Sequence, residues 1–422
     1  MNSIEIDNIT KIEGHAKLSV KLESGQVKVV HLDVVEGARY FEAMVKGRNF
    51  NEVPMITSRI CGICSQAHSL ASLQAIEKAL GVKVSNQTMQ LRNLLHLGSL
   101  IQSHALHLYF LALPDYLGFD NAVAMAQKRL LDVKRGLLLK RLGNRICEVV
   151  SGRQIHSITC VVGGFSNLPS SKQLLSLKED LQKNRQEALM TVSLFSKLKM
   201  PKLERKTVYL SLKVPKQFSL LQGNVVSSQK TDFKQEKYRQ FLTELVLPDS
   251  TAKNVLFKQS SCMVGSLARL NNGRDSLSFN AKRAAKCIKF PCYNPFMNNL
   301  CQAIEIVSFI DKSISIIEGL ELKEEPLPKI KPRSGHGISI IEAPRGLLIH
   351  ECKINSKGDI SDYNIIAPTT INIKNIEEDI SALLPSLIKK PEKEVVLELE
   401  KLIRAYDPCI SCSAHFLELN WT

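Results

Sequence analysis

Two Cys-x-x-Cys pairs, near opposite ends of the chain, place the strongest constraint on how it can fold. The first lies in RICGICSQAH (59–68) and the second in DPCISCSAH (407–415). Four thiolates form a soft ligand set suited to zinc, nickel or iron. Structural zinc modules usually hold their two pairs roughly 15–20 residues apart, whereas almost the whole chain separates these two. A site shared by them requires both ends to fold together, which suits a buried catalytic centre.

Two simpler interpretations of the cysteine pairs are open at this point. One is a structural zinc bound by four thiolates, which needs no catalytic partner residues. The other is a thioredoxin-type redox pair, but the strand–helix–strand context expected for it is missing around 61–64. The wide separation of the two pairs argues against a local zinc module, and the missing context argues against the redox pair.

The composition indicates a cytoplasmic protein without a membrane span. The chain has 422 residues, enough for two or three structural lobes, and its hydrophobic content is 44%. It has neither an apolar run of the roughly 18 residues that a bilayer requires nor an amino-terminal export signal. Eleven cysteines in a chain of this kind argue for reduced thiols rather than a disulfide framework.

The net charge of +15 is concentrated in one segment, which limits what it says about partners. Residues 197–239 carry much of the excess of lysine and arginine. The segment lacks the arginine–glycine interleaving of RNA-binding tracts. We therefore predict a solvated or partner-facing surface there, and no nucleic acid partner.

Hydrophobic periodicity predicts a mainly helical α+β protein with small sheets towards both ends. Alternating residues predict a hairpin over 15–36 that turns at Ser24-Gly25. Short apolar runs and turn residues predict a second strand-rich region over 335–368. Apolar residues at helical spacing predict long helices between the two regions and beyond them; these helices span 67–80, 89–113, 169–198, 294–319, 373–386 and 392–405.

Seven stretches together resemble the large subunit of nickel-iron hydrogenases. Besides the two cysteine motifs, they occur in the order expected for that family. They are KIEGH (11–15), SHALHLYFLALPD (103–115), GRQIH (152–156) with GG (163–164), EAPRG (342–346) and PTTIN (368–372). The wording of these motifs is most similar to that of the cytosolic branch of the family. This branch comprises the NAD(P)-linked hydrogenases and the alpha subunits of sulfhydrogenases.

The resemblance implies an organisation for the whole chain. Residues 1–415 would form the hydrogenase large subunit, comprising 1–85 with the first cysteine pair, a helical core over 86–330 and an α+β part over 331–415. Residues 416–422, FLELNWT, would be a C-terminal extension that a maturation endopeptidase removes after nickel insertion.

The resemblance also implies the metal ligands and the groups beside them. Cys61 and Cys409 would bind nickel terminally, and Cys64 and Cys412 would bridge nickel to an iron that carries carbon monoxide and cyanide. Glu13 of KIEGH matches the proton-relay glutamate of the family. Arg345 of EAPRG matches the arginine held over the open face of the metals, where a fixed cation polarises bound molecules.

A magnesium site is implied by two further matches. Glu42 and His415 match the side-chain ligands of that site, although a histidine is a less usual magnesium ligand than a carboxylate. His68 and His156 lie inside signatures and are predicted to orient the thiolates by hydrogen bonds; the alternative is that they are ordinary hydrogen-bonded core histidines. Two positions depart from common family patterns: Ser103 stands where several relatives have aspartate, and Ser157 follows His156 where proline is common.

The implied function is reversible, heterolytic cleavage of dihydrogen into protons and electrons. The electrons would leave through a small subunit with iron–sulfur clusters and a flavin and NAD(P) module, or would reduce sulfur or polysulfide. Nickel-insertion factors would be further partners. Two alternatives remain: a zinc-stabilised, non-catalytic scaffold of a redox complex, and a relative of the respiratory-complex subunit of the same fold, in which the four cysteines would be lost.

Overall fold

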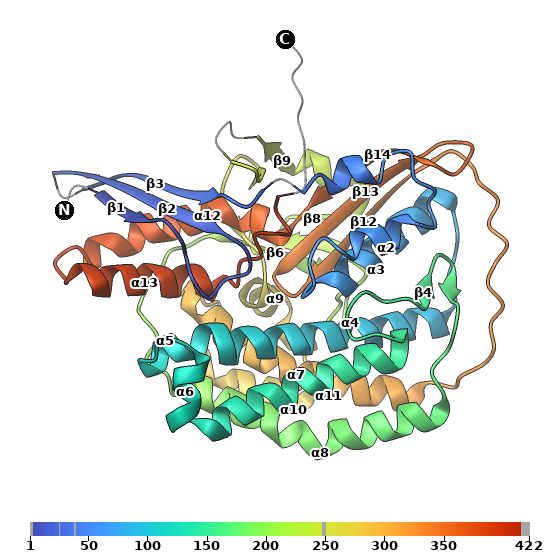
Figure 1. Ribbon diagram of the computed structural model, residues 1–422, viewed down its shortest axis with the longest axis horizontal. Helices are drawn as coiled ribbons and strands as arrows, with labels where there is room; N and C mark the ends of the chain where they lie inside the picture. The colour runs from blue at the N-terminus through green and yellow to red at the C-terminus, as the bar shows by residue number, and fades with distance from the viewer. Residues whose placement is uncertain (1–2, 25, 38, 247–249, 415–422) are drawn as a thin grey trace, which may run out of the picture.

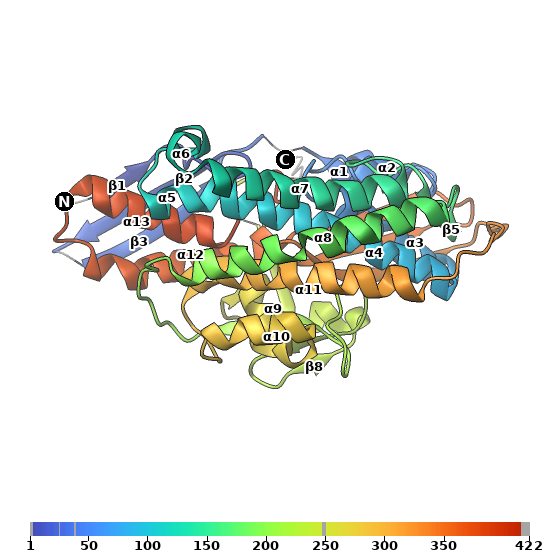
Figure 2. The same cartoon turned by 90° about the horizontal axis from the view of Figure 1, so that it is seen from below.

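The computed structural model describes residues 3–24, 26–37, 39–246 and 250–414, and it combines a long helical bundle with several small sheets (Figures 1 and 2). The predicted α+β class with a predominance of helices is confirmed. Among the described residues, no helix combines the length and the apolar character that crossing a membrane requires.

The amino-terminal sheet contains the predicted hairpin and one additional strand. Strands β2 (Ala16–Glu23) and β3 (Gln26–Val34) pair antiparallel, and β1 (Ser3–Ile6) pairs with β2 on its other side. Every second residue of β2 is buried from Ala16 onwards, as expected for a sheet with one covered face. Strand β3 packs against α12 (Pro368–Leu383), so the start of the chain lies beside a segment close to its end.

A helical bundle forms one side of the molecule. Its members are α4 (Asn86–Leu106), α7 (Leu130–Ser151), α8 (Ser171–Ser196) and α11 (Asn298–Gly319). Helices α4 and α7 cross closely because Gly143 faces α4, where an added Cβ would lie 2.5 Å from the backbone nitrogen of Gln102. The sequence predicts α8 and α11 but not α7, which has a glycine in its first half and another in its second, and many basic residues.

The predicted helix over 89–113 continues beyond its expected end. After α4 the chain forms a π-helix over His107–Ala112, and α5 (Leu113–Leu117) follows. Pro114 has no N–H to donate, which interrupts the α-helical ladder at this point. The chain therefore changes its helical pitch in the turn before the proline and continues as an α-helix through it.

The carboxy-terminal sheet and α3 position the candidate site. Strands β12 (Gly335–Ala343), β13 (Gly346–Ile354) and β14 (Ile360–Ile366) form an antiparallel meander, which confirms the predicted strand-rich region. Helix α3 (Ser65–Leu80) packs on β12 and β13. The two-residue turn Pro344-Arg345 joins these strands and lies beside the first cysteine pair.

A further sheet occurs in the middle of the chain, where the sequence predicts none. Strands β6 (Val208–Lys213), β7 (Asn224–Ser227), β8 (Asp232–Phe233) and β11 (Cys262–Met263) form it in the order β11-β6-β7-β8. These strands are short and lie among many lysines, so the alternation of apolar and polar residues that predicts a strand is hard to recognise. The remaining elements are α1 (Phe41–Met44), α2 (Val53–Thr57), α6 (Ala122–Lys128), β4 (Cys160–Val161), β5 (Gly164–Phe165), β9 (Leu242–Leu245), β10 (Asn254–Phe257), α9 (Ser266–Gly273), α10 (Phe279–Ala284), α13 (Glu392–Ala405) and short 3₁₀ turns.

Candidate metal centre

The two cysteine pairs reach the same place from two helix ends. Cys64 occupies the N-cap position of α3, and Cys61 lies in the turn before it. Cys409 and Cys412 follow the end of α13, after Asp407 with its positive φ of 52° and Pro408 have redirected the chain.

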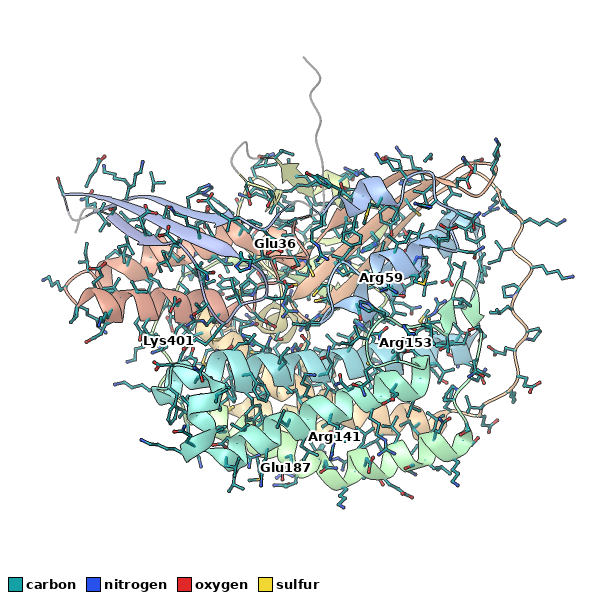
Figure 3. All side chains as sticks on the ribbon, in the orientation of Figure 1. Glu36, Arg59, Arg141, Arg153, Glu187 and Lys401 are labelled. Atoms are coloured by element: carbon teal, nitrogen blue, oxygen red, sulfur yellow. The ribbon has the colours of Figure 1, made fainter. Side chains whose placement is uncertain are left out.

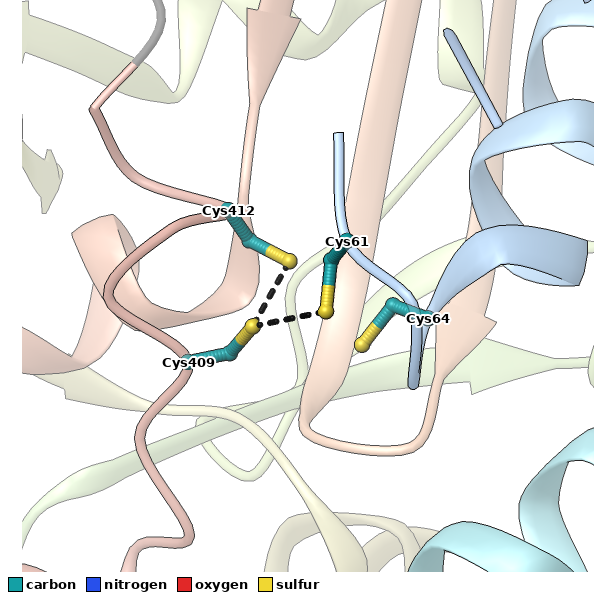
Figure 4. Close-up of side chains that lie close together, drawn as sticks. All are labelled: Cys61, Cys64, Cys409 and Cys412. Atoms are coloured by element: carbon teal, nitrogen blue, oxygen red, sulfur yellow. Dashed lines mark hydrogen bonds between the residues drawn. The ribbon is translucent and has the colours of Figure 1, made fainter. Parts of the chain in front are cut away.

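The four sulfurs point towards one another in the interior (Figure 4). All four Sγ atoms lie within 4.8 Å of one another. Cys409 Sγ is 2.8 Å from Cys412 Sγ and 3.4 Å from Cys61 Sγ. Each of these cysteines is buried and free of disulfides. Among the residues that the structure describes, this is the only group of three or more histidine, cysteine or acidic residues positioned to hold a metal.

Ionisation of the four thiols together requires nearby positive charge. Hydrogen bonds from Cys409 and the other neighbouring thiols lower the pKa of Cys61. Burial raises the pKa of Cys409 and Cys412 well above the ordinary thiol value. Four closely spaced thiolates cannot all be ionised in a buried site without nearby positive charge. The donor set therefore fits soft transition-metal cations, which would bind all four as thiolates.

Arg345 is fixed against the cysteines by three described hydrogen bonds. Its Nη1 donates to Cys64 Sγ at 3.1 Å. Its Nε donates to the backbone oxygen of Asp407 at 2.6 Å, and its Nη2 donates to Asp407 Oδ1 at 2.9 Å. The side chain is only 2% exposed. The guanidinium is thus held in one orientation by the loop that carries the second cysteine pair.

Glu13 contacts Cys409, the first cysteine of the second pair. Its Oε2 accepts from Cys409 Sγ at 3.1 Å and from the Ser411 backbone nitrogen at 3.0 Å. The Glu13 backbone oxygen also accepts from the Ile410 nitrogen, so the KIEGH segment lies directly along the second cysteine loop. Gly14 permits this approach, because its φ is +82° and an added Cβ would lie 2.8 Å from Ile410 Cβ.

Of the two signature histidines, only His68 hydrogen-bonds to a sulfur. His68 Nε2 is 3.5 Å from Cys412 Sγ, and burial lowers the pKa of this imidazole to about 4. His156 Nδ1 instead lies 3.1 Å from the Ser58 carbonyl, and its backbone nitrogen donates to Ser65 Oγ. His156 therefore fixes the segments on either side of the first cysteine pair.

Glu42 lies in a separate group of oxygen atoms. Its Oε1 accepts from the Ile365 backbone nitrogen at 2.8 Å and from Lys253 Nζ at 3.2 Å. Lys253 Nζ also donates to Glu244 and Asn364. Burial raises the pKa of Glu42. These hard oxygen donors are of the kind magnesium prefers, and the lysine ammonium lies among them. His415, the other predicted side-chain ligand, lies outside the described residues.

Three residues around the site are absent from the sequence prediction. Asp407 holds Arg345, and Thr369 Oγ1 accepts from the Cys409 backbone nitrogen at 2.9 Å. His350 Nε2 lies 3.1 Å from His68 Nδ1. Asp407 is part of DPCISCSAH and Thr369 is part of PTTIN. Their positions inside these motifs are the feature from which a place near the site could be predicted. His350 lies four residues beyond EAPRG, and only its β-strand register places it here.

Comparisons with known proteins agree with this geometry. A family model described as "Nickel-dependent hydrogenase" matches residues 39–137 and 277–415, and one described as "HoxL-like" matches 3–36. Sulfhydrogenase 1 subunit alpha of Pyrococcus furiosus is 35% identical, over 99% of this chain and 98% of its own length. The beta subunit of the NAD-reducing hydrogenase HoxS of Cupriavidus necator is 28% identical, over 98% and 94%.

A solved structure gives the same result. The crystal structure of an NAD⁺-reducing [NiFe]-hydrogenase in the H₂-reduced state matches with a TM-score of 0.87 and 26% identity. The match covers 98% of this chain and 100% of that one. The relatives and the shared fold agree over nearly the whole chain, and the family models match more than half of it. This chain belongs to the family of nickel-dependent hydrogenase large subunits.

Proposed function

We propose that Cys61, Cys64, Cys409 and Cys412 hold a nickel-iron centre, with Cys61 and Cys409 on nickel alone, Cys64 and Cys412 bridging, and carbon monoxide and cyanide on iron. The observation that carries this proposal is the group of four buried sulfurs contacted by both Arg345 and Glu13. A structural zinc would need neither contact, and family membership does not favour that alternative. The chain is a hydrogenase subunit and thus part of an oxidoreductase.

When bound, such a centre supplies heterolytic cleavage of dihydrogen. The protein contributes a fixed cation: Arg345 cannot turn away from the sulfurs, because Asp407 binds two of its nitrogens. A preorganised charge in a site closed to water stabilises developing negative charge without reorganising. Arg345 thereby favours the polarised form of a molecule bound beside Cys64.

Glu13 is the proposed proton acceptor. Its Oε2 is within hydrogen-bond distance of Cys409 Sγ, the geometry required for proton transfer between the two atoms. The Ser411 nitrogen donates to the same oxygen and so holds the carboxylate in place. Because Glu13 is only partly buried, it can pass the proton towards the surface.

Magnesium and the partners complete the proposal. Glu42, with His415, would hold a magnesium ion.

The described residues offer no second group of three or more metal-ligating side chains, so electrons would leave through an iron–sulfur small subunit. The names of two relatives, a sulfhydrogenase and an NAD-reducing hydrogenase, support sulfur or NAD as the electron acceptor. A flavin and NAD(P) module would carry the electrons to the nicotinamide. All eleven cysteines are free, which supports a cytoplasmic location, and residues 416–422 would be removed by the maturation endopeptidase.

Exchange between deuterium gas and water tests the proton-transfer step. We expect Glu13→Gln in the purified complex to lower exchange by about 10²–10⁴-fold, since the amide cannot take the proton from Cys409. Nickel content should be unchanged. The matched control is Glu187→Gln, a carboxylate paired with Arg135 on the bundle. Figure 3 labels Glu187 on the helical bundle, at the bottom of the view. Wild-type exchange by the Glu13 variant would contradict this role.

A further inference from the structure

A chain of three side chains leads from Cys412 into the interior of the carboxy-terminal sheet. Cys412 Sγ is 3.5 Å from His68 Nε2, and His68 Nδ1 is 3.1 Å from His350 Nε2. His350 Nδ1 is 2.7 Å from the Tyr363 hydroxyl. His68, His350 and Tyr363 are all at least 97% buried.

The fold explains why these side chains line up. His350 on β13 lies opposite Ile365 of β14, and Cys352, on the same face of β13, lies opposite Tyr363. His350 and Tyr363 are therefore diagonal neighbours on one face of the sheet, within reach for long side chains. Helix α3, which carries His68, packs against β12 and β13. The rings of His350 and Tyr363 meet edge to face, with centroids 5.6 Å apart and an interplanar angle of 89°.

The direction of donation along the chain follows from its end at the metal. A thiolate that binds a metal can only accept, so His68 Nε2 must carry the proton. A neutral His68 then has a bare Nδ1, which must accept from His350 Nε2. His350 in turn presents a bare Nδ1 to Tyr363, and the phenol donates. Burial raises the pKa of Tyr363 well above its usual value, so the phenol keeps this proton.

We propose that Tyr363 is a positioning residue that fixes the tautomers of His350 and His68, so that His68 always donates to Cys412. This inference rests on the proposed nickel-iron centre and adds a residue outside all seven signatures. Without the phenol, both tautomers of His350 become accessible, and donation to the sulfur weakens. A less strongly hydrogen-bonded Cys412 would be more electron-rich and would transfer more charge to the iron.

Infrared spectroscopy of the assembled, metal-loaded complex tests the proposal. In Tyr363→Phe we expect the carbon monoxide and cyanide bands to shift to lower wavenumber, with unchanged nickel and iron content. The matched control is Tyr109→Phe, which removes an equally buried hydroxyl whose partner is Thr191 of α8. Its bands should coincide with those of the wild type. Identical bands in wild type and Tyr363→Phe would overturn the proposal.

A second background separates a specific effect from a general loss of packing. His350→Leu removes the link between Tyr363 and His68, so adding Tyr363→Phe to it should cause no further band shift. A further shift would show that Tyr363 acts by another route and would overturn the proposal. Failure of the nickel-iron centre itself looks different, because the wild-type complex would then show no carbon monoxide or cyanide bands.

Discussion

The cysteine site and the cluster around Arg269 are both buried and ionisable, but they balance their charges differently. Arg269 on α9 donates to Glu305 at 2.6 and 2.7 Å and to Glu342 at 3.0 Å. At the cysteine site, Arg345 is the cation in contact, and its charge is already paired with Asp407. The Arg269 cluster is complete without a ligand, whereas the four thiols need a metal cation to ionise together.

The two regions are also physically connected. Arg269 donates to the backbone oxygens of Ala343 and Pro344, the two residues before Arg345. Glu305 is held in turn by Ser266 and His104. The Arg269 cluster thus fixes the turn that places Arg345 beside the metal site. Arg345 therefore contacts the metal-binding thiols directly, whereas Arg269 and its partners hold Arg345 in place.

The largest expected effect is the loss of a metal ligand. Cys64→Ser should abolish nickel incorporation and hydrogen uptake, since a serine hydroxyl is a hard and weakly acidic ligand. The matched control is Cys262→Ser, at a buried thiol outside the cluster whose pKa burial raises to about 12. Metal analysis and hydrogen-dependent dye reduction measure both. Full nickel content in Cys64→Ser would contradict the assignment.

Next in size is the effect of changing the fixed cation. Arg345→Lys keeps the charge but cannot contact Cys64 and both Asp407 acceptors at once. We expect the turnover rate to fall by about 10²–10³-fold, the usual cost of removing a preorganised stabilising group, while nickel remains bound. Arg135→Lys, at a bundle ion pair with Glu187, serves as the control. Equal rates for both variants would mean that Arg345 acts only in packing.

A substitution in the Arg269 cluster should change the stability of the protein rather than its metal content. Arg269→Met leaves Glu305 and Glu342 without their cation and should lower the free energy of unfolding by about 3–5 kcal/mol. Lys46→Met, which removes an exposed ion pair with Asp362, should cost at most about 1 kcal/mol. Calorimetry of the assembled complex measures both changes. Similar melting temperatures for both variants would refute the contrast.

The smallest expected effect is a change in pH dependence. Burial raises the pKa of Glu342 to about 7, so between pH 5 and 7 the folded protein holds a proton that the unfolded chain has released. Glu342 therefore contributes a loss of stability of up to about 1.4 kcal/mol per pH unit as pH rises through this range. Glu305 acts in the opposite sense: burial alone would raise its pKa, but Arg269 lowers it to about 2, so its contribution fades only below pH 5.

Glu342→Gln isolates this contribution. The variant should lose stability less steeply than the wild type between pH 5 and 7. Glu187→Gln should keep the wild-type slope. Melting temperatures across that range give the comparison, and parallel curves for wild type and Glu342→Gln would contradict it.

The cysteine site shows how far sequence reasoning reaches. The two Cys-x-x-Cys pairs predict a shared site because four thiolates together form one soft ligand set, and the structure brings the four sulfurs together. Arg345 and Glu13 were predicted only through resemblance. Their contacts with the cysteines depend on a hairpin turn and on a backbone pairing between Glu13 and Cys409, which no local pattern encodes.

The fold was predictable where periodicity is strong and unpredictable where it is weak. The amino-terminal hairpin, α8, α11 and α13 follow clear patterns and are confirmed. Helix α7 and the middle sheet were missed, because glycines in one and short strands in the other obscure the period. The chain of His68, His350 and Tyr363 required strand register, since Cys352, not His350, lies opposite Tyr363.

Metal analysis combined with infrared spectroscopy, on the complex purified from its own cells, tests the central claim most directly. We expect about one nickel and one iron on this subunit, with stretching bands of carbon monoxide and cyanide. Zinc alone, with no such bands in protein that has lost residues 416–422, would contradict it and leave a structural metal site.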